Sequence, residues 1–498
     1  MTFTLIHTSD VHGVFNDKNK GYLPILNYVK SLKGNILKID TGDALQGSPE
    51  MTFAKNNIQR LPNPMIEVFN QIKIDYYIPG NHDFNYGVSF LENFTENIES
   101  KTLAANINTE NGRPYKPYDI LSLEDKTIAI IGLTNHFISN WESKETLGDY
   151  IFENPLSVIT NILDEITDSY QPNVIIVGYH GGFECDDNFN ILKPNSENVG
   201  CQLLDPRIDI LLTSHEHRLF IKQKENTYIT QPGYQGSHLI QLEVEINDND
   251  GTVIDPKIIN LSNSNIKHSF LNMDQFLFQN EKYLHEVIAK NLSNHSLEIK
   301  DPILDRINKP YLAQLINHIQ LETTGAQISS CSLGNEITGL PNEIKVKDVL
   351  NTYIYPNTLM LCEITGSTLM KALTENAQFF DIDQDEITIS NKFLEPKKEM
   401  YQYDFYDGIQ YDILVSKNGN QIRHLYLKDY LIDPNETYTI TLNSYRYLGG
   451  GYPTWQKELK LIKEFQVDIS EIIIDYLKKE RLIDMPYENN INVIKENM

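Results

Sequence analysis

The sequence lacks basic charge and long apolar runs, and both absences exclude classes of protein. Its 498 residues include 42 Lys and Arg against 68 Asp and Glu, a formal net charge of −26. Such a surface repels phosphodiester polymers, which argues against long DNA or RNA as partners. No apolar run approaches the ~18 residues that a membrane helix needs. An acidic protein that handles a small anion needs local positive charge, which bound metal ions can supply.

Cysteine is scarce, and the first residues lack the marks of an export signal. The four cysteines (Cys185, Cys201, Cys331 and Cys362) show no CxxC spacing. We therefore expect free thiols in a reducing compartment. Residues 1–10 contain neither the basic nor the apolar segment of a signal peptide. If the native protein begins at Met1, these features predict a cytoplasmic location, whereas a trimmed sequence would change that expectation.

The chain is too long for one hydrophobic core and suits two domains. Residues 262–268 are polar and typical of a loop, and apolar side chains then recur at helical intervals from Met273 to Leu292. We predict a first domain over 1–268, a linker helix within 269–295 and a second domain over 296–498. The sequence shows no internal repeat and leaves the oligomeric state open.

Short apolar runs alternate with amphipathic stretches through the first half, which predicts an α/β sandwich. The candidate strands are Thr4–Thr8, Asn35–Ile39, Tyr76–Ile78, Thr102–Ala105, Ile128–Gly132, Val174–Val177 and Ile208–Leu212.

Polar residues follow these runs, where the carboxyl ends of strands share one edge of a sheet. They are Asp10, His12, Asp43, Asn81, His82, Asn106, His180, His215 and His217. Carboxylates, an amide and histidines form a mixed oxygen and nitrogen donor set for divalent metals. Two such ions are a known arrangement for phosphoester hydrolysis.

Each motif alone also has an ordinary explanation. Asp-x-His occurs often by chance, the 80–83 stretch could be a turn with an Asx cap, and His215 and His217 could lie on opposite sides of a strand. His7 lies inside a strand and is interpreted as a packed core histidine. Six further histidines carry no spacing signal: His136, His238, His285, His295, His318 and His424.

The order of the motifs narrows the interpretation. Asp-x-His, Gly-Asp, Gly-Asn-His-Asp, a lone His and His-x-His follow one another over residues 10–217. This order resembles the calcineurin-like metallophosphoesterase superfamily. The stretches 5–13, 41–49 and 80–87 are similar to the 5′-nucleotidase and 2′,3′-cyclic phosphodiesterase family. The resemblance implies a four-layer α/β/β/α catalytic domain and a C-terminal α/β substrate-binding domain.

The resemblance also implies roles for single residues. One divalent ion would be held by Asp10, His12, Asp43 and His217. A second would be held by Asp43, Asn81, His180 and His215, with Asp43 bridging. Sequence does not choose among Zn, Mn, Fe and Co.

His82 matches the histidine that contacts the phosphate in the transition state, and Asn106 is a weaker candidate for phosphate contact. The family's 5′-nucleotidases carry an aspartate three residues after this histidine, where this chain has Asn85. Asparagine there resembles the cyclic-phosphodiesterase branch, although drift at one position would also explain it. An amide still accepts a hydrogen bond from the ring but does not stabilise its positive charge as a carboxylate does.

The second half resembles the family's nucleotide-binding domain at residues 353–359, 403–411 and 443–453. Tyr403 and Tyr445 fall on the positions of the two rings that clamp the base, an arrangement that tolerates several bases. Gly450 would let the backbone pass close to the substrate. Arg446 is equally explained as a substrate contact or an ordinary surface arginine. Gly451 stands where 5′-nucleotidases carry an aspartate, which again favours the cyclic branch.

The sequence thus predicts a metal-dependent hydrolase that opens nucleoside 2′,3′-cyclic phosphates to 3′-nucleotides, with a further step to nucleosides left open. A 5′-nucleotidase or nucleoside-diphosphate-sugar hydrolase is the nearest alternative. A catalytically inactive nucleotide-binding protein is a second, although the complete ligand set argues against it. The expected partner is a small-molecule nucleotide, with neither long nucleic acid nor membrane.

Overall fold

The computed structural model describes residues 1–498 except 193–195, 248–250, 263, 302, 336, 356, 396–397, 451–453 and 497–498. The chain forms two compact units, Met1–Asn280 and Glu281–Met498. Gly451 and part of the 353–359 stretch lie outside the described residues, so the expectations placed on them stay predictions.

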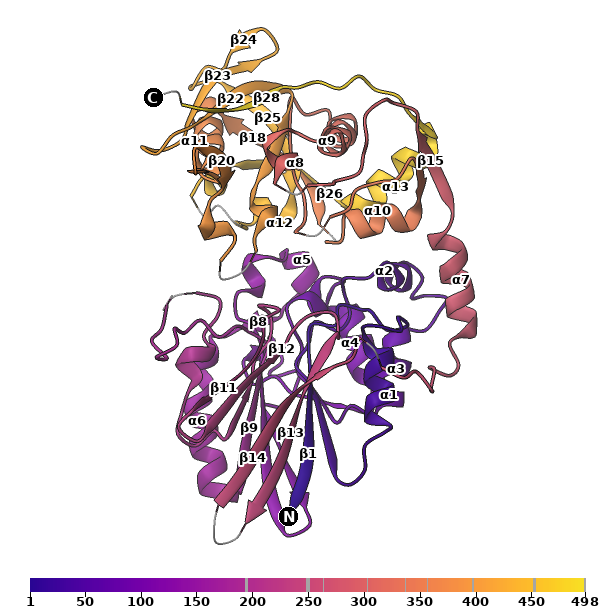
Figure 1. The fold of residues 1–498 in the computed structure, drawn as a ribbon, viewed down its shortest axis with the longest axis vertical. Coiled ribbons are helices and arrows are strands. Elements are labelled where there is room, and N and C mark those ends of the chain that lie inside the picture. The colour runs from indigo at the N-terminus through magenta and orange to yellow at the C-terminus, as the bar shows by residue number, and fades with distance from the viewer. Residues whose placement is uncertain are drawn as a thin grey trace. The chain divides into compact units, whose positions relative to one another are not determined.

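Two six-stranded sheets form the centre of the first unit (Figure 1). The first sheet has the order β14 (Gly251–Asn260), β13 (His238–Asn247), β1 (Thr2–Thr8), β2 (Ile36–Asp40), β3 (Tyr76–Tyr77) and β4 (Lys101–Thr102). The second has the order β11 (Leu219–Lys224), β12 (Thr227–Pro232), β10 (Ile210–Leu212), β9 (Val174–Tyr179), β7 (Lys126–Leu133) and β6 (Tyr118–Leu123).

Apolar side chains from both sheets meet in one buried layer. Phe3, Leu5 and Ile39 of the first sheet pack in the same cluster as Ile130 and Ile176 of the second. Burial of such side chains removes apolar area from water at roughly 25 cal/mol per Å². This shared core explains why the strands read as near-continuous apolar runs rather than as strict alternation.

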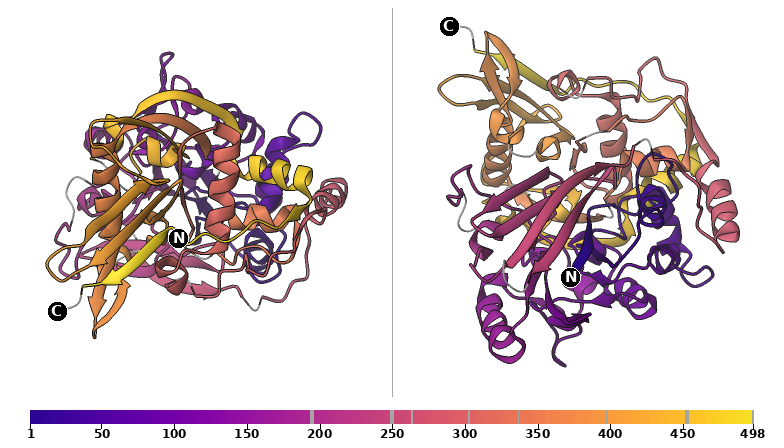
Figure 2. Two further views of the ribbon diagram at one scale, coloured as in Figure 1. Left: turned by 90° about the horizontal axis from the view of Figure 1, so that it is seen from above. Right: turned by 60° about the horizontal axis from the view of Figure 1, so that its bottom comes forward.

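Helices cover the outer faces of the two sheets (Figures 1 and 2). Ile159, Ile162 and Ile166 of α6 (Pro155–Tyr170) pack in one cluster with Ile131 of β7 and Val177 of β9. The helices of the other face are α1 (Tyr22–Val29), α3 (Pro64–Ile72) and α4 (Val88–Asn97). This arrangement confirms the predicted four-layer α/β/β/α sandwich.

The parallel strands bring their carboxyl ends to a common edge. β1, β2, β3 and β4 run parallel in the first sheet, and β7, β9, β10 and β12 run parallel in the second. Each of the seven candidate strands from the sequence overlaps a strand of these sheets. Shorter elements complete the unit: α2 (Pro49–Asn56), α5 (Lys144–Leu147), β5 (Ile107–Asn108), β8 (Ile151–Phe152) and the 3₁₀ turns His82–Phe84, Ile138–Asn140 and Gly200–Leu203.

The linker helix is shorter than predicted. Helix α7 spans Asp274–Leu284, and β15 (Val287–Asn291) follows it. β15 pairs with β17 (Glu343–Lys345) and β27 (Leu482–Ile483), so tertiary pairing overrides the helical spacing of Val287 and Ile288. Phe276 packs against Phe15 in the first unit, whereas Leu284 belongs to the core of the second.

A five-stranded sheet forms the centre of the second unit. Its order is β21 (Asp404–Asp407), β16 (Ile328–Ser332), β25 (Thr437–Asn443), β18 (Thr358–Thr365) and β26 (Lys460–Asp468). The helices are α8 (Leu304–Ile307), α9 (Tyr311–Thr324), α10 (Val346–Thr352), α11 (Gly366–Ala377), α12 (Ser444–Tyr447) and α13 (Ile469–Glu480).

Two smaller sheets complete the second unit. One has the order β24 (Tyr430–Leu431), β23 (Gln421–Leu427), β22 (Ile409–Val415) and β28 (Ile491–Lys495), so the yellow C-terminal strand runs beside β22 (Figure 2). The other is the hairpin of β19 (Phe380–Asp383) and β20 (Glu386–Ile389). Both units are therefore mixed α/β, as predicted.

The expectation of four free cysteines is wrong. Cys185 and Cys201 form a disulfide across a sequence separation of 16 residues, whereas Cys331 and Cys362 are free and buried. The two partners carry no CxxC spacing, so only folding reveals that they meet. A disulfide is typical of an oxidising compartment, so the cysteines no longer support the cytoplasmic expectation.

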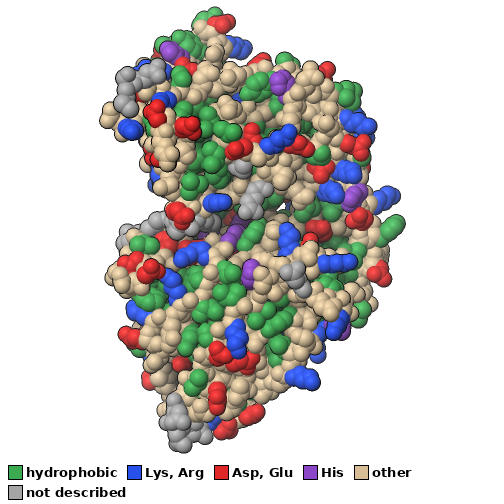
Figure 3. Space-filling model, in the orientation of Figure 1, with side chains coloured by type: hydrophobic (Ala, Val, Ile, Leu, Met, Phe, Trp, Pro, Cys, Tyr) green, Lys and Arg blue, Asp and Glu red, His purple; other side chains and the backbone are tan. Residues whose placement is uncertain are grey.

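Among the described residues, no helix is both long and apolar enough to cross a bilayer. Acidic and basic side chains are interspersed over the visible face, so the net charge of −26 is not gathered into one patch there (Figure 3).

Candidate functional site

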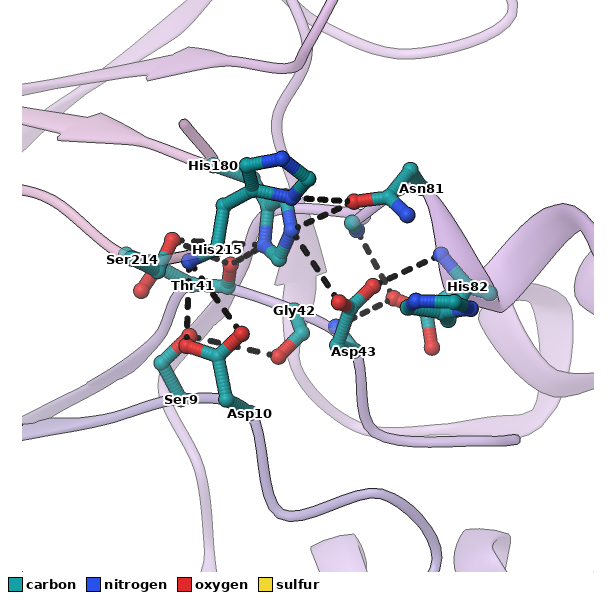
Figure 4. A network of polar contacts seen from close by, with 12 residues as sticks. Ser9, Asp10, Thr41, Gly42, Asp43, Asn81, His82, His180, Ser214 and His215 are labelled. Carbon is teal, nitrogen blue, oxygen red and sulfur yellow. Dashed lines mark hydrogen bonds and ion pairs between the residues drawn. The ribbon is translucent and has the colours of Figure 1, made fainter. Parts of the chain in front are cut away.

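Seven of the side chains singled out in the sequence meet at the strand ends of the first unit. Figure 4 labels Asp10, Asp43, Asn81, His180 and His215 among them. Asp10 and His12 follow β1, Asp43 follows β2, and Asn81 follows β3. His180 comes directly after β9, and His215 and His217 lie between β10 and β11. They come together because neighbouring parallel strands end at the same edge of each sheet.

Asp10, His12 and His217 form one group of potential ligands. One donor atom from each lies within 4.8 Å of the others. The Nε2 atoms of His12 and His217 are 3.1 Å apart, and Nε2 of His217 is 3.6 Å from Oδ1 of Asp10. Three donors that face one another at these separations leave space for one small cation.

Asp43, His180 and His215 form the second group, again within 4.8 Å. The amide oxygen of Asn81 faces this group, at 3.0 Å from Nε2 of His180 and 2.8 Å from Nδ1 of His215. Asp43 lies between the two groups. Its Oδ2 atom is 3.3 Å from Nε2 of His180 and 3.9 Å from Nε2 of His12.

Acceptors hold the outer nitrogens of several of these histidines. Nδ1 of His12 lies 3.1 Å from the carbonyl oxygen of Gln46, and Nδ1 of His180 lies 2.5 Å from that of Thr41. A carbonyl only accepts, so each Nδ1 carries a hydrogen, and Nε2 is the nitrogen that faces the centre of the site. A metal-binding histidine is commonly oriented in this way, by an acceptor that binds the ring nitrogen turned away from the metal.

The backbone of the site is strained. Asp10, His12, Asp43, His215 and His217 all have φ between 52° and 71°. Residues other than glycine rarely adopt this left-handed region, and strain of this kind clusters at functional sites. Five ligand candidates in one unfavourable conformation indicate that side-chain placement outweighs the backbone strain here.

Burial dominates the electrostatics of the site. Burial raises the pKa of Asp10 to about 7 and lowers that of His12 to about 3. Burial also opposes charge on His180, but the carboxylates of Asp43 and Asp10 and the hydrogen bond to Thr41 together outweigh it and raise the pKa of His180 to about 9. Buried carboxylates are costly unless they are paired or bound to a metal, so this donor set suits cations.

His82 faces the same centre without joining either group. Its backbone N–H donates to Oδ1 of Asp43 at 2.7 Å, and its Nδ1 lies 2.7 Å from Oδ1 of Asn85. Asn85 therefore occupies the orienting position that the sequence suggested. His7 is a buried core histidine as expected, held between the hydroxyls of Thr41 and Thr230 at 2.9 Å each.

Asn106 binds backbone groups within the domain, rather than a phosphate as the sequence suggested. Its amide donates to the carbonyls of Thr134 and Glu153 and accepts from the N–H of Thr134. Asn106 is fully buried, and it ties the end of β7 to the chain that leads to α6.

The comparisons with known proteins agree with this geometry. Residues 3–219 match the family described as calcineurin-like phosphoesterase, and residues 296–458 match the 5′-nucleotidase C-terminal domain. The chain combines a calcineurin-like phosphoesterase domain with a 5′-nucleotidase C-terminal domain. It is therefore a hydrolase of phosphoric esters.

Proteins with nucleotidase and phosphoesterase names resemble this chain over most of its length. The trifunctional nucleotide phosphoesterase YfkN of Bacillus subtilis is 25% identical over 92% of this chain, which spans 36% of the length of that protein. A 2′,3′-cyclic-nucleotide 2′-phosphodiesterase/3′-nucleotidase of Salmonella typhimurium is 23% identical over 84% of this chain and 75% of its own. A putative 5′-nucleotidase from Staphylococcus aureus aligns over the full length of both chains, with 26% identity and a TM-score of 0.91.

Four residues that support the phosphoesterase site carried no signal of their own in the sequence. Asp83 accepts hydrogen bonds from the backbone N–H groups of Asp43, Ala44, Leu45 and Gly80, and so fixes the loop after β2. Its place in Gly-Asn-His-Asp could have drawn attention to it.

Glu197, Trp141 and Tyr234 contact the outer sides of ligand candidates. Oε1 of Glu197 lies 3.1 Å from Nε2 of His215. The Trp141 ring stacks on His215 at 5.7 Å and 14°, and the Tyr234 ring stacks on His217 at 4.3 Å and 25°. No spacing rule connects these residues to the motifs, so only the fold identifies them.

The C-terminal domain differs from the expected aromatic clamp. Tyr403 is fully buried and packs against Phe379, Phe380 and Phe405 at 4.9–5.1 Å, so it is a core residue. Tyr401, two residues earlier, lies beside Tyr445 instead, with 6.3 Å between the ring centroids and an edge-to-face angle of 77°.

Arg446 is not an ordinary surface arginine. It is 1% exposed and contacts both carboxylate oxygens of Asp404 at 2.9 Å. It also donates to the carbonyls of Tyr401 and Gly450, so it holds the backbone beside the Tyr401 ring. A Cβ atom on Gly450 would lie 2.3 Å from the Tyr445 ring, which explains glycine at this position.

Proposed function

We propose that this phosphoesterase hydrolyses nucleoside 2′,3′-cyclic phosphates to 3′-nucleotides and then to nucleosides. The observation that carries this choice is the Asn85 side chain, whose Oδ1 lies 2.7 Å from Nδ1 of His82. Asparagine at this position resembles the cyclic-phosphodiesterase branch, and a relative from Salmonella typhimurium bears that name.

We further propose that the first group, with Asp43, holds one divalent ion and that the second group, with Asn81, holds another. The donor set fits this role because its carboxylates are buried and its histidines turn Nε2 or Nδ1 inward. The oxygen and nitrogen donors suit Zn, Mn, Fe or Co. Two bound ions would activate a water molecule and neutralise charge on the phosphoryl group.

The protein's own side chains orient the substrate. In this proposal, His82 donates from its ring to a phosphate oxygen, since it faces the centre without belonging to either ligand group. Hydrogen bonds of this kind lower the barrier where negative charge grows in the transition state.

The base would stack on aromatic rings of the C-terminal domain. Tyr401 and Tyr445 replace the pair expected from the sequence, because Tyr403 is buried, whereas the rings of Tyr401 and Tyr445 are half-buried and lie edge to face. Stacking is worth about 1–3 kcal/mol per base and depends little on which base is bound. The proposed substrate is therefore a small nucleotide of broad base identity.

The deciding experiment compares 2′,3′-cyclic AMP, 3′-AMP and 5′-AMP as substrates, each with Mn²⁺ and with a chelator. Metal-dependent hydrolysis of 2′,3′-cyclic AMP and 3′-AMP, with little hydrolysis of 5′-AMP, would support the proposal. Fast hydrolysis of 5′-AMP alone would reject it in favour of a 5′-nucleotidase. The 5′-nucleotidase name of the full-length Staphylococcus aureus neighbour favours that second candidate.

A further inference from the structure

Glu142 contacts the residue that orients His82. The side-chain amide of Asn85 donates from Nδ2 to Oε1 of Glu142 at 2.6 Å, while its Oδ1 lies 2.7 Å from Nδ1 of His82. His82, Asn85 and Glu142 are thus joined in one line of hydrogen bonds. The sequence offered no reason to connect Glu142, 57 residues after Asn85, with this site.

This line of contacts fixes which way the Asn85 amide points. An ionised carboxylate only accepts hydrogen bonds, so Asn85 must turn its NH₂ group to Glu142 and its carbonyl oxygen to His82. Nδ1 of His82 then has to carry a hydrogen. With Glu142 gone, the amide could rotate by 180° and turn its NH₂ group towards Nδ1, which would break the contact that orients the ring.

The segment that carries Glu142 is itself well held. The N–H groups of Trp141 and Glu142 both donate to the carbonyl of Ile138 at 3.0 Å. Ser143 then caps α5 through the N–H of Thr146. The Trp141 ring stacks on His215, so adjacent side chains of this segment support two histidines of the site.

From these contacts we propose that Glu142 is a positioning residue for His82, acting through Asn85. It holds the amide in one orientation and places a carboxylate two hydrogen bonds from the ring. The pair Asn85 and Glu142 thereby does together what a single aspartate at position 85 would do alone. This inference rests on the proposed role of His82 in phosphate contact.

A double-mutant cycle tests the proposal, with Asn85→Asp, Glu142→Gln and the combined variant in the full chain. Asn85→Asp alone places two carboxylates in contact, which repel one another. Glu142→Gln alone removes the charge. In the combined variant, the new amide at position 142 donates to the new carboxylate at position 85. That carboxylate accepts a hydrogen bond from His82. The hydrogen-bonded line from His82 to position 142 is therefore restored, with the negative charge at position 85 instead of 142.

We expect each single variant to lose about tenfold in kcat with little change in KM, as is usual for residues that orient an active side chain. The combined variant should return to within about threefold of the wild type, a strongly non-additive result. Additive losses of about a hundredfold would overturn the proposal, and so would a Glu142→Gln variant equal to the wild type. Glu145→Gln, an exposed glutamate three residues further on, is the matched control.

The cycle is read with p-nitrophenyl phosphoesters in Mn²⁺, so its result does not depend on the natural nucleotide. Failure of the wild type on 2′,3′-cyclic AMP would reject the proposed function and leave the cycle readable. Metal content and thermal unfolding of each variant identify any that misfold.

A second readout needs no turnover. In ¹⁵N-histidine-labelled protein, the His82 signals, identified by their loss in His82→Gln, should show a hydrogen on Nδ1. Glu142→Ala should shift the Nδ1 signal, because it releases the amide that accepts this hydrogen, and an unchanged signal would overturn the proposal.

Discussion

The two units contain candidate sites of opposite physical character. In the first, buried carboxylates and histidines converge from several strand ends, on backbone that includes five ligand candidates at positive φ. In the second, two half-buried tyrosines, Tyr401 and Tyr445, meet edge to face from a 3₁₀ turn and the short helix α12. Buried charged ligands need fixed positions because water does not solvate them. A tyrosine ring that stacks on a base needs only an accessible face.

This contrast predicts different responses to substitution. A single substitution in the first site should cause a large loss of activity, because removal of one ligand leaves other buried polar groups without a counterpart. The second should respond in proportion to the ring area lost. If so, substitutions in the first site should lower activity more than substitutions in the second.

Asp43→Asn should have the largest effect, because Asp43 lies between both ligand groups and also accepts from the N–H of His82. We expect a loss of about a thousandfold or more in kcat, with less bound metal. Phosphoester turnover and metal content by mass spectrometry measure these effects. Retention of both ions and of activity would contradict the bridging position.

Tyr403→Ala and Tyr401→Ala should separate a core residue from a binding residue. Tyr403→Ala should reduce the free energy of unfolding by about 3–5 kcal/mol, because the ring is fully buried. Tyr401→Ala should weaken nucleotide binding by about 1–3 kcal/mol and leave stability nearly unchanged. Denaturant titration and KM values measure the two effects.

Tyr401→Phe keeps the ring and serves as the control for binding. If Tyr403→Ala instead left stability intact and raised KM, the original assignment of the clamp would be right.

Glu197→Gln should weaken metal binding by about tenfold, because Glu197 faces Nε2 of His215 at 3.1 Å and helps to orient that ring. Competition with a chelating dye measures the affinity directly. Glu225→Gln, on an exposed turn of the same unit, should match the wild type. Equal affinity in both variants would remove Glu197 from the support of the site.

Replacement of Cys185 and Cys201 by serine should have the smallest effect on turnover. The disulfide closes a loop of 16 residues, for which about 3 kcal/mol of stabilisation is the usual upper range. Because Glu197 lies within this loop, metal affinity should fall slightly as well. Thermal unfolding with and without a thiol reductant measures the effect, and the serine variant should no longer respond to the reductant.

The polar residues of the first site were predictable because spacing and strand position are local properties. Asp10, His12, Asp43, Asn81, His180, His215 and His217 each follow a recognisable apolar run, and parallel strands must end together. The sandwich followed from the same alternation of strands and helices. Asn106 and the length of the linker helix were misjudged, because each depends on hydrogen bonds to distant backbone.

The pattern of residues was enough to predict an α/β sandwich, the order of the ligand candidates and the position of Asn85 beside His82. Three features became apparent only in the folded chain: Tyr401 rather than Tyr403 lies beside Tyr445, Cys185 meets Cys201, and Glu142 reaches Asn85. The physical reason is the range of the interactions. Periodicity and motif spacing act along a few residues of chain, whereas burial, ring contacts and hydrogen bonds across loops exist only once distant segments have packed.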